Sequence, residues 1–85
     1  MTKTINETVE VVAKFAGDIE NIRPSQFKWQ DREFNVKKST RYRYRNGDEV
    51  VYVFSVTDGF SSFELDFNLR DFSWMLRKVC DMKLA

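Results

Sequence analysis

The chain has 85 residues with 14 Lys plus Arg, 13 Asp plus Glu, no His and one Cys. A chain of this length forms one small domain, and its eight Phe, three Tyr and two Trp must fill the core. The net charge of +1 excludes a global field that would hold the protein on nucleic acid or an anionic membrane, so any such binding needs a local patch.

Cysteine usage and the first residues bear on the cellular setting and on the domain limits. A single Cys and no opening apolar run behind basic residues predict a reducing, cytoplasmic setting, without a secretion signal, a membrane span or a membrane partner. Residues 1–6 are polar, and we expect them to be disordered. No repeat or linker suggests a second domain, so residues 7–82 are predicted to form a single β-domain.

The first regular segment has strand periodicity. Apolar residues occupy alternate positions from Thr8 to Phe15, at Val9, Val11, Ala13 and Phe15. After Gly17, Ile19 and Ile22 are expected to close the edge of a barrel. Pro24 follows, and its fixed φ and missing donor suit the entrance of a strand rather than its middle.

The run from Phe27 to Val36, "FKWQDREFNV", predicts an amphipathic hairpin. We expect Trp29 opposite Phe34 and Phe27 opposite Val36, so that all four side chains share the inner face. A two-residue Asp31-Arg32 turn gives the same pairing but needs positive φ at Arg, so a loop from Gln30 to Glu33 is favoured. The polar residues 37–40 then bend the strand or interrupt it with a bulge.

Two strong hairpin signals, Asn46-Gly47 and Asp58-Gly59, separate the next three alternating segments and predict a meander. A two-residue Asp58-Gly59 turn places aromatic and aliphatic residues opposite one another: Phe54 with Phe63, Tyr52 with Leu65, and Val50 with Phe67.

The register of the "RYRYR" segment, residues 41–45, depends on the Asn46-Gly47 turn. A two-residue turn would place the arginines on the apolar face. A three-residue loop ending in Gly47 pairs Tyr42 with Val50 and Arg43 with Glu49, which puts both tyrosines in the core and all three arginines outside. We favour the three-residue loop, because burying the tyrosines gains more apolar contact.

The last segment, residues 69–82, fits two structures. Leu69, Phe72, Leu76 and Val79 fit a helical stripe, with Asn68 as a cap, but Trp74 falls outside that stripe. As a strand, residues 73–80 point Trp74 and Leu76 inward, with a slip before Val79. Periodicity alone does not decide between them.

The chain resembles small bacterial proteins and domains of unknown function over about residues 24–79. Their shared pattern is matched here by Pro24, Phe27, Trp29, Arg32, Phe34, Val36, Asp58, Gly59, Phe63, Glu64, Leu65, Trp74, Leu76 and Val79. In the first hairpin turn, where that family tends to have Gly, this chain has Asp31. The resemblance implies that the last segment is a strand closing a small sheet or barrel, and it implies no activity.

Candidate catalytic groups are few, and we predict that the protein is not an enzyme. Without His, the usual general base and imidazole metal ligands are missing, and no cofactor or metal is expected. Cys80 lies in an apolar segment and is interpreted as an inert thiol. Glu64 and Asp66 share one strand face. We interpret them as solvent-exposed acids that neutralise the charge of the arginines, rather than as a catalytic pair.

The most distinctive segment is "KKSTRYRYR", residues 37–45, with five positive charges, no acid and two tyrosines. Small β-barrels bind single-stranded nucleic acid by stacking bases on exposed aromatics while Arg and Lys follow the phosphates. Exposed tryptophans would add to such a groove, whereas buried ones would seal the ends of the core. The candidate binding patch is therefore Lys37, Lys38, Arg41, Arg43, Arg45, Trp29 and Trp74.

Together these features predict an all-β protein with a small, antiparallel, strongly twisted sheet or SH3-like barrel of about six strands. The predicted function is a non-catalytic module that binds a protein partner, or a second copy of itself, through edge strands. The alternative is weak binding of single-stranded nucleic acid through the basic segment, which is disfavoured because the expected register separates tyrosines from arginines.

Overall fold

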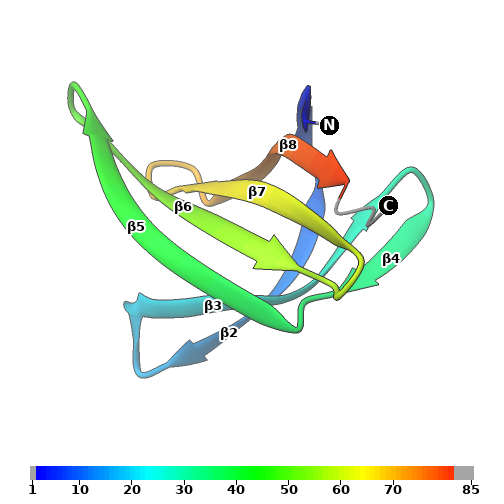
Figure 1. The fold of residues 1–85 in the computed structure, drawn as a ribbon. Coiled ribbons are helices and arrows are strands. Elements are labelled where there is room, and N and C mark those ends of the chain that lie inside the picture. The colour runs from blue at the N-terminus through cyan, green and yellow to red at the C-terminus, as the bar shows by residue number, and fades with distance from the viewer. Residues whose placement is uncertain (1, 82–85) are drawn as a thin grey trace.

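The protein is all-β in a computed structural model that describes residues 2–81, apart from the side chains of residues 16, 18–20, 46 and 81 (Figure 1). Residue 82, the end of the predicted domain, and the Ile19 side chain lie outside the described part. Eight strands follow one another: β1 Thr2–Thr8, β2 Glu10–Ala16, β3 Asp18–Trp29, β4 Arg32–Asn35, β5 Lys38–Asn46, β6 Glu49–Thr57, β7 Ser61–Asn68 and β8 Ser73–Asp81.

The strands form two antiparallel sheets rather than one. The larger has the order β1-β8-β7-β6-β5, and the smaller has the order β2-β3-β4. The chain passes between the sheets at Val9, whose N–H donates to Trp74 O at 3.1 Å. It returns at Val36 and Lys37, whose N–H groups donate to Ser25 O and Thr57 O, one in each sheet. The smaller sheet thus lies across one face of the curved larger one (Figure 1).

The core lies between the two sheets and is rich in aromatic rings. Phe27 of β3 stacks on Phe34 at 5.0 Å between centroids and meets Phe63 of β7 edge-on at 4.9 Å. Leu65 and Leu76 are completely buried beside them. Ile22 is buried in the same cluster, whereas it was expected at a barrel edge. The aromatic composition therefore serves packing across the sheets, as its abundance predicts.

The strand and antiparallel predictions are confirmed, but eight strands form where about six were expected, and the described residues do not form a closed barrel. The final segment is strand β8 rather than a helix. Trp74 and Leu76 point inward, and Val79 packs on the same core after a register shift opposite Glu64 and Leu65. Within residues 2–81 there is no helix with the length and apolar character needed to cross a membrane.

The start of the chain was expected to be disordered, but residues 2–8 form β1 and pair with β8. Its mostly polar side chains are exposed, so an apolar pattern does not reveal the strand; Ile5 alone packs on the core. Main-chain hydrogen bonds to β8 satisfy the backbone instead. Asn6, with φ of 55°, lies at a register shift in this strand.

Pro24 was expected at the entrance of a strand, but it is buried within β3. The register shifts at this point, because Val12 is opposite Gln26 whereas Ala13 is opposite Pro24. Ser25 is the extra residue, and its Oγ donates to Val12 O at 3.0 Å. A bulge is one of the few places where an internal strand tolerates the missing N–H of proline.

Two hairpins have the predicted inner faces but different pairing. Phe27 is opposite Phe34, not Val36, because the turn contains only Gln30 and Asp31, with φ of 53° and 60°. Positive φ at both residues is the geometry of a type I′ turn. The two-residue shift keeps the same side chains inside, since side chains alternate with a period of two.

In the hairpin between β6 and β7, Phe54 is opposite Leu65, not Phe63. The loop is longer than two residues because the Asp58 carboxylate accepts hydrogen bonds from the N–H groups of Phe60 and Ser61, each at 2.9 Å. This Asx-type turn favours pairing of Thr57 with Ser62. Here too the shift is by two residues, so the predicted apolar face is retained.

The predicted register of β5 is wrong, and the observed register reverses which side chains of β5 lie on the inner side of the sheet. Asn46 pairs with Glu49, so the turn residues are Gly47 and Asp48. Only Gly47 has positive φ, 64°, as in a type II′ turn with glycine first. The arginines therefore share the inner side of the sheet, and the tyrosines lie outside: Arg41 is opposite Phe54 and Tyr42 opposite Val53.

We expect Asp31→Gly to stabilise the fold, because glycine adopts positive φ without the steric cost that a Cβ imposes. The free energy of unfolding should rise by about 0.5 to 1 kcal/mol, measured by urea denaturation. Asp31→Ala is the matched control and should lower it, since Ala tolerates this conformation less well than Asp. A glycine variant no more stable than the alanine variant would contradict the type I′ turn.

Candidate functional site

The predicted basic residues gather along β5, an edge strand of the larger sheet. We call Lys37, Lys38, Arg41, Arg43 and Arg45 the basic edge; all five are exposed. Lys37 lies just before the strand, with its side chain over Gly59. Within residues 2–81, β5 pairs only with β6, so its other side is open along nine residues.

The main-chain N–H and C=O groups of successive β5 residues point alternately toward β6 and toward the open side of the strand. Asn46 and Glu49 flank a two-residue turn and therefore form a hydrogen-bonded pair. Alternation along the ladder then directs the N–H and C=O groups of Tyr44 and Tyr42 toward β6. Those of Arg43 and Arg45 point toward the open side. The arginines thus combine outward main-chain groups with cationic side chains.

A polar cleft lies between β3 and the inner side of β5. It has a volume of about 310 Å³ and is lined by Asn21, Ile22, Arg23, Ser39, Arg41 and Phe54. Among the side chains that the structure describes, two of its lining residues are arginines and none is acidic. The Arg41 guanidinium lies 4.9 Å from the centroid of the Tyr52 ring, so this exposed residue covers the rim of the core through a cation–π contact. We call this hollow the arginine cleft.

The outer side of β5 carries the two tyrosines. Tyr42 and Tyr44 are 58% and 42% exposed, which overturns the expectation that they are core. They lie beside Val53 and Val51, which are buried even though they are on the outer face. Tyr44 lines a second hollow, of about 220 Å³, together with Glu49, Val51, Asp66, Asn68, Ser73, Met75 and Arg77. The outer face of β5 therefore lies next to Glu49, Asp66 and Arg77.

Asp66 and Arg77 form a partly buried ion pair in that second hollow. Arg77 Nη1 donates to Asp66 Oδ2 at 3.0 Å, whereas Asp66 Oδ1 and Arg77 Nε are buried without a hydrogen-bond partner. Burial raises the pKa of Asp66, and the nearby Arg77 charge opposes that shift. Asp66 was interpreted as solvated, but it is buried and bound to Arg77 rather than to the β5 arginines.

The two tryptophans of the predicted patch do not join the basic edge. Trp74 is 8% exposed and packs 4.6 Å from Phe67 and 5.4 Å from Phe54, between ring centroids, so it is a core residue. Trp29 is half-buried against the core, and its Nε1 is buried without a partner. Trp74 is thus buried and Trp29 partly buried, which agrees with the alternative that the tryptophans belong to the core rather than to an exposed groove.

Arg23 is the cleft residue that the sequence reasoning missed. It lies on β3, far along the chain from the basic segment, and nothing in its local pattern distinguishes it. A pairing signal was available for β5 itself, because Gly-Asp, like Asn-Gly, is a two-residue hairpin sequence. That reading gives the observed faces and places Arg41 inward.

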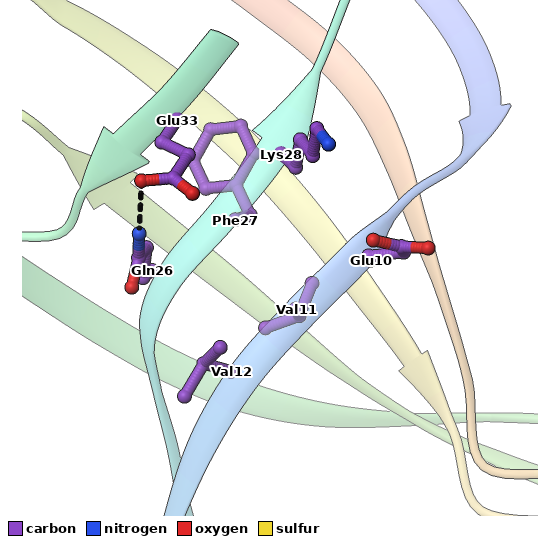
Figure 2. Close-up of a pocket in the computed structure, with 7 residues that line it drawn as sticks. All are labelled: Glu10, Val11, Val12, Gln26, Phe27, Lys28 and Glu33. Atoms are coloured by element: carbon purple, nitrogen blue, oxygen red, sulfur yellow. Dashed lines mark hydrogen bonds between the residues drawn. The ribbon is translucent and has the colours of Figure 1, made fainter. Parts of the chain in front are cut away.

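A shallow pocket of about 130 Å³ occupies the outer face of the smaller sheet (Figure 2). Lys28 lies between Glu10 and Glu33 in one cross-strand row. Gln26 Nε2 donates to Glu33 Oε2 at 2.9 Å. Because Gln26 and Glu33 bind each other rather than a group in the pocket, we regard it as a surface depression.

The other candidate reactive groups, Cys80 and Glu64, line one hollow of about 280 Å³ together with Thr2, Ser55, Ser62, Phe63 and Lys78. Cys80, the single Cys of the chain, is half-buried in β8. Glu64 is half-buried on the outer face of β7. In the part of the chain that the structure describes, no cluster of three or more His, Cys, Asp or Glu side chains could hold a metal ion.

Comparisons of the chain with protein-family models, curated proteins and solved structures found no significant match. The resemblance to small bacterial domains of unknown function therefore stays a prediction.

We expect the stability of the protein to depend on pH through Asp66. Its raised pKa means that the folded protein binds this proton more readily than the unfolded chain does. The contribution of Asp66 to the free energy of unfolding therefore falls as the pH rises from about 4 through the folded pKa. In urea denaturation, the stability of Asp66→Asn relative to the native protein should increase over that range.

Arg77→Gln provides the control for this pH dependence. Removing the cation that lowers the pKa of Asp66 should steepen the loss of stability with pH. A difference between Asp66→Asn and the native protein that stays constant from pH 4 to 7, or shrinks, would contradict the assignment.

Proposed function

We propose that the protein is a non-catalytic interaction module that binds an extended segment of a partner protein along the open side of β5. In this mode the partner adds a strand to the sheet, so that main-chain hydrogen bonds supply affinity and alternate side chains supply specificity. The observation that carries the proposal is the open side of β5, where Arg43 and Arg45 direct their main-chain groups outward.

The other sheet edges are less suitable for strand addition. β1 and β2 contain register shifts, and β4 has only four residues. β5, by contrast, pairs with β6 in one unbroken register from Lys38 to Asn46. Natural proteins protect sheet edges by shortness, bulges and charge. Only the last of these protections applies along β5, and charge selects among partners rather than excluding all of them.

The lack of His in the chain supports a non-catalytic role, because the hollow that Cys80 and Glu64 share offers no imidazole as a general base. The arginine cleft contains arginines and a serine, and none of its described lining residues is a general base. Such a lining is suited to holding an anionic group in place.

Arg43→Pro tests strand addition directly, because it removes an outward N–H while leaving the ladder to β6 intact. In affinity capture from native cytosol, we expect a specific protein to be retained by the native chain and by Arg43→Lys, and to be lost with Arg43→Pro. Amides 39–45 should gain protection from hydrogen exchange in the complex. Equal capture by Arg43→Pro would contradict the proposal.

Tyr42→Pro is the matched control for folding. Its N–H belongs to the ladder with β6, so this variant should lose about 1 to 3 kcal/mol of stability with that hydrogen bond, whereas Arg43→Pro should lose less. Thermal unfolding of both variants shows whether a loss of binding comes from the changed β5 edge or from unfolding of the protein.

A second candidate function is weak binding of single-stranded nucleic acid, and the exposure of Tyr42 and Tyr44 is the observation that favours it. If three cations of the basic edge contact phosphates, log affinity for oligothymidine should fall with log salt with a slope of about −2. Loss of binding in an Arg41→Ala, Arg43→Ala, Arg45→Ala variant would support this function. No binding at low salt would exclude it.

A further inference from the structure

The partner segment can be specified by its chemistry, an inference that rests on the proposed strand addition. We infer that β5 takes an acidic strand, with Asp or Glu at every second position, rather than a second copy of this chain. The charge and the alternation of β5 carry the argument: Lys38, Arg41, Arg43 and Arg45 lie on it without any acid.

The alternation of β5 dictates the partner's pattern. In a paired strand, directly opposite residues lie on the same face, with Cβ atoms about 4.5 to 5.5 Å apart. Arg41, Arg43 and Arg45 share the inner face, so opposite positions of the partner favour carboxylates. Tyr42 and Tyr44 occupy the outer face, so the intervening positions favour β-branched or aromatic side chains. Both strands have the same rise per residue, so this match of side chains is repeated along the whole length of β5.

The arginine cleft supplies a specific seat for one of those carboxylates. A strand added beside β5 points its inner side chains toward β3, where the cleft opens between Arg23 and Arg41. Ser39 lies on the same wall and offers a hydroxyl donor. Arg23 and Arg41 both line the cleft and none of its described lining residues is acidic, so the charge of these residues favours an anionic side chain over a cationic one.

A second copy of the chain fits this edge poorly. In a symmetric antiparallel pair of β5 strands, the same faces meet, so arginines stand opposite arginines. Like charges directly opposite one another in a sheet are destabilising. The basic edge therefore discourages self-pairing through β5 while it favours an acidic partner.

Nucleic acid fits less well than an acidic strand. Arginines and tyrosines lie on opposite faces of β5, so a base stacked on Tyr44 would hold its phosphate away from the arginine cleft. The hollow beside Tyr44 offers that phosphate little positive charge, because Arg77 in its lining is paired with Asp66, and Glu49 is paired with Arg70. An acidic strand instead places its charges and its apolar groups on the faces that match.

The test uses three ten-residue peptides in which Thr alternates with Glu, Gln or Lys. By fluorescence anisotropy at low salt, we expect the Glu peptide to bind about tenfold more tightly than the Gln peptide, since three exposed charge pairs each contribute modestly. The Lys peptide should not bind. Amide chemical-shift changes should map to β5 and to the arginine cleft.

Charge reversal provides the decisive variant. Arg43→Glu with Arg45→Glu should reverse the order, so that the Lys peptide binds more tightly than the Glu peptide; Arg41 is left in place because it packs on Tyr52. Arg23→Glu alone should weaken the Glu peptide and remove the shift changes in the cleft. Circular dichroism checks that each variant remains folded.

Several outcomes would overturn the inference. Equal affinity for the Glu and Gln peptides would remove the role of charge, and tighter binding of oligothymidine than of the Glu peptide would assign the basic edge to nucleic acid. The proposed function fails by a different result, namely capture that is insensitive to Arg43→Pro. A captured partner that is sensitive to that substitution but docks through a neutral segment would leave strand addition standing and refute the acidic partner.

Discussion

The structure depends on aromatic packing between two sheets that are joined by continuous chain. Phe27 of the smaller sheet lies against Phe34 and meets Phe63 of the larger sheet edge-on, so one ring links both layers. A chain of this size has little other apolar surface with which to hold two sheets together. Crossing points at Val9 and at Val36–Lys37 then fix how the smaller sheet lies over the larger.

That packing leaves β5 only partly covered. The inner residues of β6 and β7 are buried, whereas on the inner side of β5 the core gives way to the arginine cleft. Arg41 covers Tyr52 with its guanidinium, so a charged side chain can occupy an inner position without being desolvated. The same arrangement that tolerates inward arginines also exposes them along an open sheet edge. The fold and the proposed binding surface therefore have one physical origin.

Much of the fold follows from local pattern, and the failures have identifiable causes. The apolar faces of the hairpins containing Phe27 and Phe54 were predicted, although each pairing was shifted by two residues by turn chemistry at Gln30-Asp31 and at Asp58. For β5 the shift changed the face, because the turn lies at Gly47-Asp48. An assumption that tyrosines must be buried outweighed that turn signal. β1 was missed because its side chains are mostly exposed and its main chain is satisfied by β8.

The sequence by itself determined the class of fold, the aromatic content of the core and the alternation of Arg with Tyr, since these depend on composition and on a period of two. Tertiary structure alone decided which face of β5 meets the core and that Arg23 joins Arg41 in one cleft. Local periodicity is the same for either face, so only the turn geometry and the other sheet can distinguish them. Residues far apart in the chain converge only when the two sheets pack, which no local pattern encodes.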